Sequence, residues 1–244
     1  MIIIKSMLLG VNIDHIATLR NARGGVEPSV FEAAKLCETL KVNGITMHLR
    51  EDRRHIKDED VFLVKEKVNL KLNLEMAATQ EMQNIILKLM PEACCIVPEK
   101  RQEVTTEGGL DVYSNFEYIK NFVKPLLTAN IEVSLFIDPD EKQVKAAKDV
   151  GVNFIELHTG TYANTFGTSL ENDSFNKLKK TAQLADSMGL YVNAGHGLNY
   201  ENVLRMHEIN CLNELNIGHS IISKAIFNGF ESAVLEMKNL IQRK

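Results

Sequence analysis

The chain contains 244 residues, of which 45% are hydrophobic and 25% are charged, and its formal net charge is -4. This composition is typical of a globular protein, and the length suits one large core such as a barrel of ~250 residues. The sequence has no polybasic tail and no run of ~18 apolar residues, so it gives no support to nucleic-acid or membrane binding. We therefore expect a protein whose partners are small molecules.

The apolar N-terminal stretch, residues 1–13, is interrupted early by Lys5 and has no small-residue cleavage site after it, so we interpret it as a buried strand rather than a signal peptide. The cysteines show no CxxC spacing, and the adjacent pair would point to opposite faces of a strand. Reduced core thiols in a cytoplasmic protein are the favoured interpretation. The four cysteines are Cys37, Cys94, Cys95 and Cys211.

Short apolar runs rich in β-forming residues recur along the whole chain, each followed by a polar loop. Several lack a clean in-out alternation, as expected for parallel strands that are covered on both faces. The eight predicted strands are residues 8–13, 44–49, 71–76, 93–98, 132–137, 154–159, 191–196 and 214–219.

Most of the intervening segments have apolar residues at helical spacing, with Gly151 and Gly189 placed as helix C-caps. Alternating strands and helices require right-handed crossovers, and eight units close into an α/β TIM (β/α)8 barrel. An open doubly wound sheet is the competing architecture, but no GxGxxG motif follows the first strand. The predicted helical segments are 30–40, 60–68, 81–90, 141–151, 177–189 and 230–240.

Nothing in the sequence resembles an interdomain linker, so we expect a single barrel domain over residues 1–244, with extra short helices. Two segments fit the pattern less well. Pro125 lies inside a helical pattern and predicts a break or a kink, whereas residues 161–173 are polar and are expected to be irregular.

Reactive side chains gather at the predicted C-terminal ends of the strands, where barrel enzymes carry their active sites. A single histidine there is usually structural, but six on one face favour a functional site, and clustered arginines favour anion binding, although some could simply pair with carboxylates. The histidines are His15, His48, His55, His158, His196 and His219, and the arginines are Arg20, Arg23, Arg50, Arg53, Arg54 and Arg101.

Two anion pockets are indicated. Strands seven and eight end in AGHG and IGHS, where glycines allow a ligand close to backbone N–H groups, and a predicted helix begins after Gly218. The alternative is that these glycines only permit tight turns. Arg50, His55 and Thr105 could hold a second phosphate. The glycine pair at 108–109 favours either a lid with hinge-like freedom or a simple surface excursion.

Acid and base groups would lie between the two pockets. Histidine titrates near neutral pH, and a desolvated glutamate can be raised toward it, so proton transfer is the expected use. The glutamates could instead be neutral or paired core residues. The groups are His48, Glu75, Glu156, His158 and His196.

At this point the chain resembles the pyridoxine 5'-phosphate synthase family almost from end to end. The resemblance implies a TIM barrel that joins 1-deoxy-D-xylulose 5-phosphate to 3-amino-2-oxopropyl phosphate in vitamin B6 biosynthesis, without a metal or organic cofactor. It also implies a homo-oligomer, with an octamer expected. The motifs that carry it are GVNIDHIATLRNARG, HLREDRRHI, NLEMA, VPEKRQEVTTEGGLDV, SLFID, FIELHTG, NAGHGL and ELNIGH.

The resemblance also implies roles for individual residues. His48 and Glu75 would be general bases, His196 the proton donor, and Glu156 the group that stabilises the transition state. The residues implied for the amino-ketone phosphate are Asn12, Arg23, Gly197, Gly218 and His219. Those implied for the deoxyxylulose phosphate are Asp14, His15, Arg50, His55 and Thr105.

Three alternatives stay open from the residues alone. A metal-dependent aldolase or epimerase could use His48, Glu75, His158 and His196 as ligands. A Schiff-base aldolase is disfavoured because no lysine ends a strand, and Lys100 lies in a loop. A non-catalytic phospholigand-binding barrel would keep the anion pockets, but the row of acid and base groups argues against it.

Overall fold

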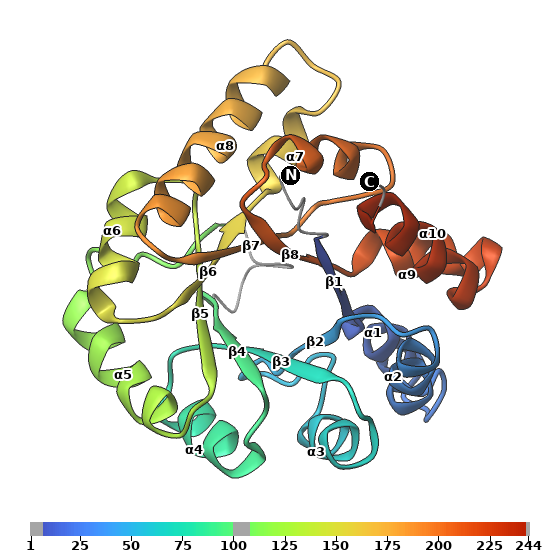
Figure 1. Cartoon of the computed structure of the whole chain (residues 1–244). Coiled ribbons are helices and arrows are strands. Elements are labelled where there is room, and N and C mark those ends of the chain that lie inside the picture. Colours follow the sequence, from blue (N-terminus) through green and yellow to red (C-terminus); the bar gives the residue numbers. More distant parts are fainter. Residues whose placement is uncertain (1–6, 100–107, 243–244) are drawn as a thin grey trace.

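The computed structural model describes residues 7–99 and 108–242. Eight strands form a closed barrel in which each pairs in parallel with the next, and β8 returns to β1. Figure 1 shows the strands as a central ring with the helices around it. The strands are β1 (Leu8–Asn12), β2 (Gly44–His48), β3 (Lys71–Met76), β4 (Ala93–Ile96), β5 (Glu132–Ile137), β6 (Phe154–His158), β7 (Tyr191–Gly195) and β8 (Leu212–Ile217).

The barrel and all eight predicted strands are confirmed, although β8 begins at Leu212 rather than Glu214. The predicted helical segments are also helical, and short additional helices are present. The helices are α1 (Asp14–Arg23), α2 (Val30–Thr39), α3 (Asp58–Lys67), α4 (Gln80–Leu89), α5 (Phe116–Thr128), α6 (Glu141–Val150), α7 (Gly160–Thr165), α8 (Glu171–Ser187), the 3-10 helix η1 (Asn202–Glu208), α9 (His219–Asn228) and α10 (Phe230–Gln242).

Local sequence explains where several helices begin and end. Side-chain oxygens of Ser29, Thr79 and Asp140 accept hydrogen bonds from backbone N–H groups in the first turns of α2, α4 and α6. These bonds satisfy donors that have no partner within the helix. Gly151 ends α6 in the left-handed conformation that was expected of a C-cap.

Two local expectations, a helix break at Pro125 and an irregular segment 161–173, were wrong. Pro125 does not break α5, because it lies near the helix end, where the N–H of Ala129 bonds to its carbonyl and the neighbouring apolar face is buried. The segment 161–173 is largely helical, since buried Tyr162 anchors α7 and donates a hydrogen bond to Asn202 O at 2.7 Å.

The hydrophobic core has two parts. The larger cluster fills the space between the strands and the helices, and a small one contains Cys95, Val97 and Phe136. Cys94 belongs to the larger cluster, which confirms that the adjacent cysteines face opposite sides of β4. All four cysteines carry free thiols.

Polar side chains lie among the apolar residues inside the barrel. Thr46 donates to Asn216 Oδ1 at 2.8 Å, and Asn216 Nδ2 donates to Glu156 Oε2 at 2.6 Å. These bonds join strands that are not neighbours in the sheet, so the side chains cross the barrel interior. The buried carboxyl of Glu156 therefore lies in a hydrogen-bonded interior rather than against an outer helix.

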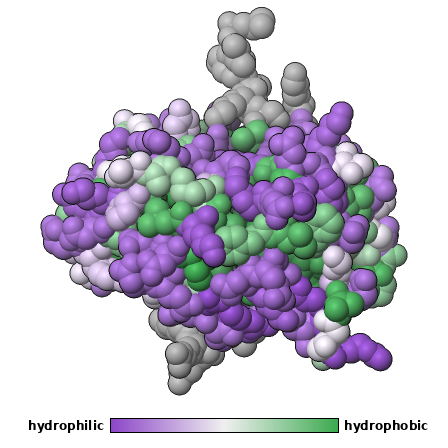
Figure 2. All heavy atoms as spheres, turned by 90° about the horizontal axis from the view of Figure 1, so that it is seen from below, coloured by the Kyte–Doolittle hydropathy of each residue, from purple (hydrophilic) through white to green (hydrophobic). Residues whose placement is uncertain are grey.

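The helices present mostly polar residues to solvent. Figure 2 shows hydrophilic side chains over much of one side of the molecule, with hydrophobic side chains between them. Within residues 7–99 and 108–242, no helix combines the length and apolar character needed to cross a membrane.

Candidate active site

The barrel brings most of the predicted site residues to the C-terminal ends of its strands. His48 ends β2, Glu75 lies near the end of β3, and Glu156 lies within β6. His196 follows β7 directly, and His219 begins α9 after β8. Thr105 and Arg101 lie outside the described residues, so no placement is available for that part of the second anion pocket.

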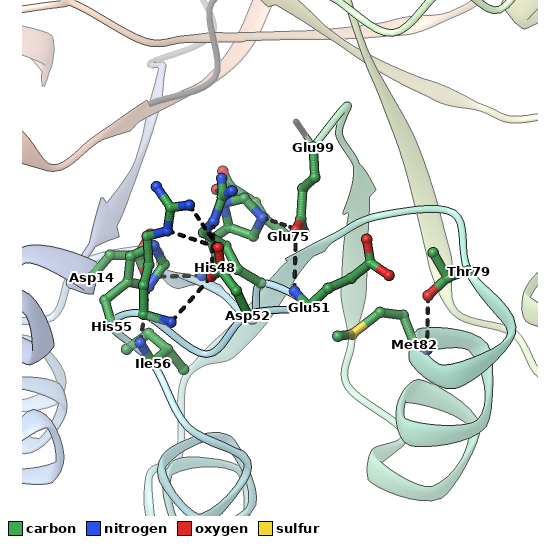
Figure 3. A network of polar contacts seen from close by, with 12 residues as sticks. Asp14, His48, Glu51, Asp52, His55, Ile56, Glu75, Thr79, Met82 and Glu99 are labelled. Atoms are coloured by element: carbon green, nitrogen blue, oxygen red, sulfur yellow. Dashed lines mark hydrogen bonds and ion pairs between the residues drawn. The ribbon is translucent and has the colours of Figure 1, made fainter. Parts of the chain in front are cut away.

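His48 is the centre of a buried network (Figure 3). Its Nε2 lies 2.9 Å from Glu99 Oε1, and its Nδ1 lies 3.9 Å from Glu75 Oε2. Glu99 also accepts a hydrogen bond from the backbone N–H of Glu51 at 3.1 Å. Burial opposes ionisation of Glu99, but these hydrogen bonds lower its pKa. An ionised carboxylate thus holds one side of the His48 ring, and the other side faces Glu75.

Asp14 ties the end of β1 to the same network. One oxygen accepts from the backbone N–H of His48 at 2.8 Å, and the other accepts from Asn12 Nδ2 at 2.8 Å. His55 packs edge-on against His48 with ring centroids 5.8 Å apart. Burial lowers the pKa of His55, although Asp14 acts in the opposite direction. This wall of the site therefore combines one anchored carboxylate with two neighbouring imidazoles.

Glu75 and Glu156 both hold protons more tightly than an ordinary glutamate. Burial is the main cause for Glu75, with the carboxyl of Glu156 adding to it, and together they raise its pKa well above 4.5. Burial also raises the pKa of Glu156 to about 8, although the hydrogen bond from Asn216 opposes the change. A carboxyl group whose pKa is raised toward neutral pH, such as that of Glu156, can exchange protons with a substrate.

His196 follows β7, which lies across the closed barrel from β2 and β3. Burial lowers its pKa to about 4, and the neighbouring His158 contributes in the same direction. The two rings lie 4.9 Å apart, and His158 Nδ1 contacts Asp138 Oδ1 at 3.0 Å. His196 is therefore a neutral imidazole at pH 7 in the unliganded protein.

Packing within the protein requires glycine at the positions after β7 and β8. Gly197 is left-handed, with φ +82°, and a Cβ there would lie 2.7 Å from Ala163 Cβ. A Cβ on Gly218 would lie 2.8 Å from the Asn12 side chain. These contacts account for both glycines without a ligand. The first turn of α9 has no side-chain cap among the described residues, however, so its N–H groups can donate hydrogen bonds to an anion.

His15 meets His219 at this end of the barrel, with ring centroids 5.0 Å apart in an edge arrangement. Burial is the main cause that lowers the pKa of His15. Its buried Nδ1 has no hydrogen-bond partner among the described residues. The two predicted substrate-binding histidines are thus brought together from opposite ends of the chain.

The predicted arginines differ in their burial and in their protein partners. Arg20 was expected at an anion-binding rim, but it is buried and makes two hydrogen bonds to Asp60, at 2.6 and 2.9 Å. Arg53 pairs with Asp58, as the carboxylate-pairing alternative predicted. Arg50 is buried beside Asp52, whereas Arg23 ends α1 and is exposed.

Arg54 likewise pairs with Asp52, at 2.6 Å. The hydrogen bonds from both arginines lower the pKa of Asp52 although burial opposes them. The arginines of the segment after β2 are thus held by ion pairs with carboxylates of the protein and do not form a row of free cations. Arg50 is part of the same loop, with its Nε 3.3 Å from Asp52 Oδ1.

The ligand set expected of a metal-dependent aldolase is not brought together in the described part of the chain. The group found there instead is Asp14, His48 and His55, whose candidate ligand atoms lie within 4.8 Å of one another. Both Asp14 oxygens accept hydrogen bonds from protein donors, and His55 Nδ1 accepts one from Ile56 N–H. Hydrogen bonding within the protein therefore accounts for the cluster.

Sequence reasoning missed three residues that support the site. Glu99 contacts His48, Asp138 contacts His158, and the Thr159 hydroxyl contacts the backbone beside His196. Each directly follows a predicted strand or ends one, which is the available signal. Their importance comes from contacts between strands, so composition and spacing do not distinguish them.

Comparison with known proteins places this geometry in a family. Residues 9–243 match the family model described as "Pyridoxal phosphate biosynthesis protein PdxJ". A pyridoxine 5'-phosphate synthase of Neisseria meningitidis is 56% identical over 237 residues, covering 97% of this chain and 98% of that relative. One from Prochlorococcus marinus is 55% identical over 233 residues, covering 96% and 98% respectively.

Solved structures at much lower identity share the fold. KGPDC from Streptococcus mutans has a TM-score of 0.64 at 15% identity, with coverage of 98% of this chain and 99% of that one. Thiamine phosphate pyrophosphorylase from Pyrococcus furiosus has a TM-score of 0.62 at 12% identity, with coverage of 96% and 95%. The sequence matches, over nearly the whole length of the chain, show that it belongs to the pyridoxal phosphate biosynthesis protein PdxJ family.

Proposed function

We propose that the chain is a pyridoxine 5'-phosphate synthase that joins 1-deoxy-D-xylulose 5-phosphate to 3-amino-2-oxopropyl phosphate. The observation that carries this proposal is the placement of His48 and Glu75 on β2 and β3 and of His196 after β7, across the closed barrel from them. The names of relatives more than half identical over nearly their whole length support the same reaction.

The groups on the first wall suit proton abstraction. His48 is held by Glu99 on one side and lies 3.9 Å from the Glu75 carboxyl on the other. Because the pKa of Glu75 is raised, that carboxyl takes up a proton more readily than an ordinary glutamate. His48 and Glu75 act as the general bases, and a proton can pass between them within the network.

His196 supplies a proton on the opposite wall. The neutral imidazole of the unliganded protein becomes a better proton carrier when substrates bring phosphate groups, since nearby anions stabilise imidazolium. Glu156 stabilises charge in the transition state, because its buried carboxyl, with a pKa of about 8, can be protonated and can donate a hydrogen bond.

Two phosphate sites frame these groups. The uncapped first turn of α9 and the backbone beyond β7 hold the amino-ketone phosphate. The amino-ketone residues are Asn12, Arg23, Gly197, Gly218 and His219. Arg50 and the imidazoles near Asp14 hold the deoxyxylulose phosphate. The deoxyxylulose residues are Asp14, His15, Arg50, His55 and Thr105.

Ring formation then needs only positioning and proton transfer. The substrate amine attacks a carbonyl carbon and water leaves to form an imine. Phosphate departs, and enolisation followed by aldol-type closure and loss of a second water gives the pyridine ring. No step requires a protein nucleophile, a metal or an organic cofactor.

We also propose a cytoplasmic homo-oligomer, an octamer by resemblance to the family. The exposed side chains of Leu19 and Val26 near α1, and of Ile226 and Phe227 on α9, are large and apolar. Contacts between α1 and α9 place these elements together, so their surfaces can contribute to a subunit interface. Sedimentation of the purified protein tests the state directly.

The decisive experiment incubates the purified chain with both phosphates and follows pyridoxine phosphate absorbance and inorganic phosphate release. Product should form, and excess chelator should leave the rate unchanged. His48→Ala, Glu75→Ala and His196→Ala should each lower turnover roughly a hundredfold or more. Tight binding of both phosphates without phosphate release would instead support a non-catalytic barrel, and loss of activity with chelator would support a metal-dependent enzyme.

A further inference from the structure

His196 has an unfavourable backbone conformation. Its φ is +79°, a left-handed value that non-glycine residues adopt only at an energetic cost. The next residue, Gly197, is left-handed too, and a Cβ on the preceding Gly195 would lie 2.4 Å from Glu156 Oε1. Surrounding contacts must therefore hold this turn in place.

The buried hydroxyl of Thr159 supplies such contacts. Its Oγ1 lies 2.8 Å from Gly195 O and 2.5 Å from His196 O, and its backbone N–H donates to Gly195 O at 2.9 Å. Thr159 has no exposed surface. Thr159, which follows β6, therefore contacts the backbone carbonyl groups of both Gly195 and His196. These contacts hold the backbone on both sides of the His196 Cα and fix the path of the turn.

The imidazole ring of His196 is held by a second set of contacts. The His158 ring lies 4.9 Å away and Phe136 lies 6.5 Å away, both edge-on. His158 is itself oriented by Asp138, an ionised partner whose pKa the hydrogen bond to His158 lowers. The ring orientation of His196 thus depends on β5 and β6.

The orientation of His158 leaves one of its nitrogens without a protein partner. Nδ1 donates to Asp138, and the buried Nε2 has no hydrogen-bond partner among the described residues. A Cβ on Gly160 would lie 2.5 Å from that Nε2, so glycine there is needed to admit the ring.

We infer that Thr159 and His158 are positioning residues for His196, with Thr159 fixing its backbone turn and His158 fixing its ring. This inference rests on the proposed role of His196 in proton transfer. Neither residue needs to touch substrate. Correct placement of the proton donor matters because a misplacement of ~1 Å can cost roughly a hundredfold in rate.

Replacement of His158 should also change how His196 titrates. The charged and titratable groups described around the pair are Asp138 just after β5, Lys177 on α8, which acts on Asp138, and Glu156 on β6, whose carboxyl lies against Gly195. His158 opposes protonation of His196. His158→Phe keeps an aromatic ring but removes that opposition, so the pKa of His196 should rise.

The first experiment compares Thr159→Val, which keeps the shape but loses the hydroxyl, with Thr159→Ser, which keeps the hydroxyl. Thr181→Val is the matched control, because Thr181 is also buried and its hydroxyl bonds only within α8, to Lys177 O. Thr159→Val should lower kcat roughly tenfold to a hundredfold with little change in KM. Thr159→Ser and Thr181→Val should stay within about threefold of the parent.

The second experiment measures the His196 imidazole titration by NMR in the parent and in His158→Phe, with kcat against pH in parallel. An upward shift in both supports the inference. An unchanged titration overturns the role of His158, and wild-type kcat in folded Thr159→Val overturns that of Thr159. His196→Ala tests the proposed function separately from the positioning roles. Near-normal turnover in that variant would contradict the catalytic role of His196 itself.

Discussion

Glu156→Gln should stabilise the protein while lowering its activity. The carboxyl is 2% exposed, and burial raises its pKa from 4.5 to about 8. In the unfolded chain this group ionises above pH 4.5, whereas in the folded chain it stays protonated until about pH 8. The folded state therefore binds more protons in that window, and stability falls as pH rises through it.

The width of this pH window sets the size of the change in the free energy of unfolding. At ~1.4 kcal/mol per pH unit, the loss accumulated by pH 7 is about 3 kcal/mol. Glutamine does not ionise, and its carbonyl can still accept the hydrogen bond from Asn216 that Glu156 accepts at 2.6 Å. The variant should thus be more stable than the parent by roughly 2–3 kcal/mol at pH 7 and by much less at pH 4.5.

Urea unfolding followed by circular dichroism at pH 5, 6, 7 and 8 measures this difference, with protein concentration held fixed because oligomers gain stability by association. Glu231→Gln on the surface of α10 is the control and should change stability by no more than about 1 kcal/mol, the contribution of a first-turn carboxylate to a helix. Turnover of Glu156→Gln should fall about tenfold or more, since the proposed transition-state contact is weakened. A pH-independent stability difference, or a destabilised variant, would refute the reasoning.

Three further predictions follow from the site's surroundings. Arg20→Ala should lower stability by about 3–5 kcal/mol in chemical denaturation, because it leaves a buried carboxylate unpaired, and a loss below 1 kcal/mol would contradict a buried ion pair. Gly218→Ala should cost about 1–3 kcal/mol and disturb Asn12, visible as a shifted amide side-chain NMR signal, whereas an unperturbed signal would show that the site relaxes freely. Mixing Arg23→Ala with His196→Ala chains should restore some activity after subunit exchange if exposed Arg23 completes a neighbour's site; confirmed exchange without activity would restrict Arg23 to its own chain.

The sequence by itself determined the architecture and the location of the site. Eight apolar runs alternating with helical patterns predict a barrel because each unit leaves an apolar face that only its neighbours can cover. Histidines placed after those runs must then converge, since parallel strands all end at the same rim. His48 and His196 were identified in this way, and both lie where the periodicity places them.

Only the tertiary structure decided what each polar residue does at the rim. Arg20 and Asp60 are 40 positions apart, and His48 and Glu99 are 51 apart, so no local pattern pairs them. Arg20 consequently looked like an anion-binding group although it is a buried structural partner. Burial and neighbouring charges set the pKa of Glu156, and contacts between β6 and the turn after β7 fix the left-handed His196. These properties depend on distances between separate strands, which local periodicity does not encode.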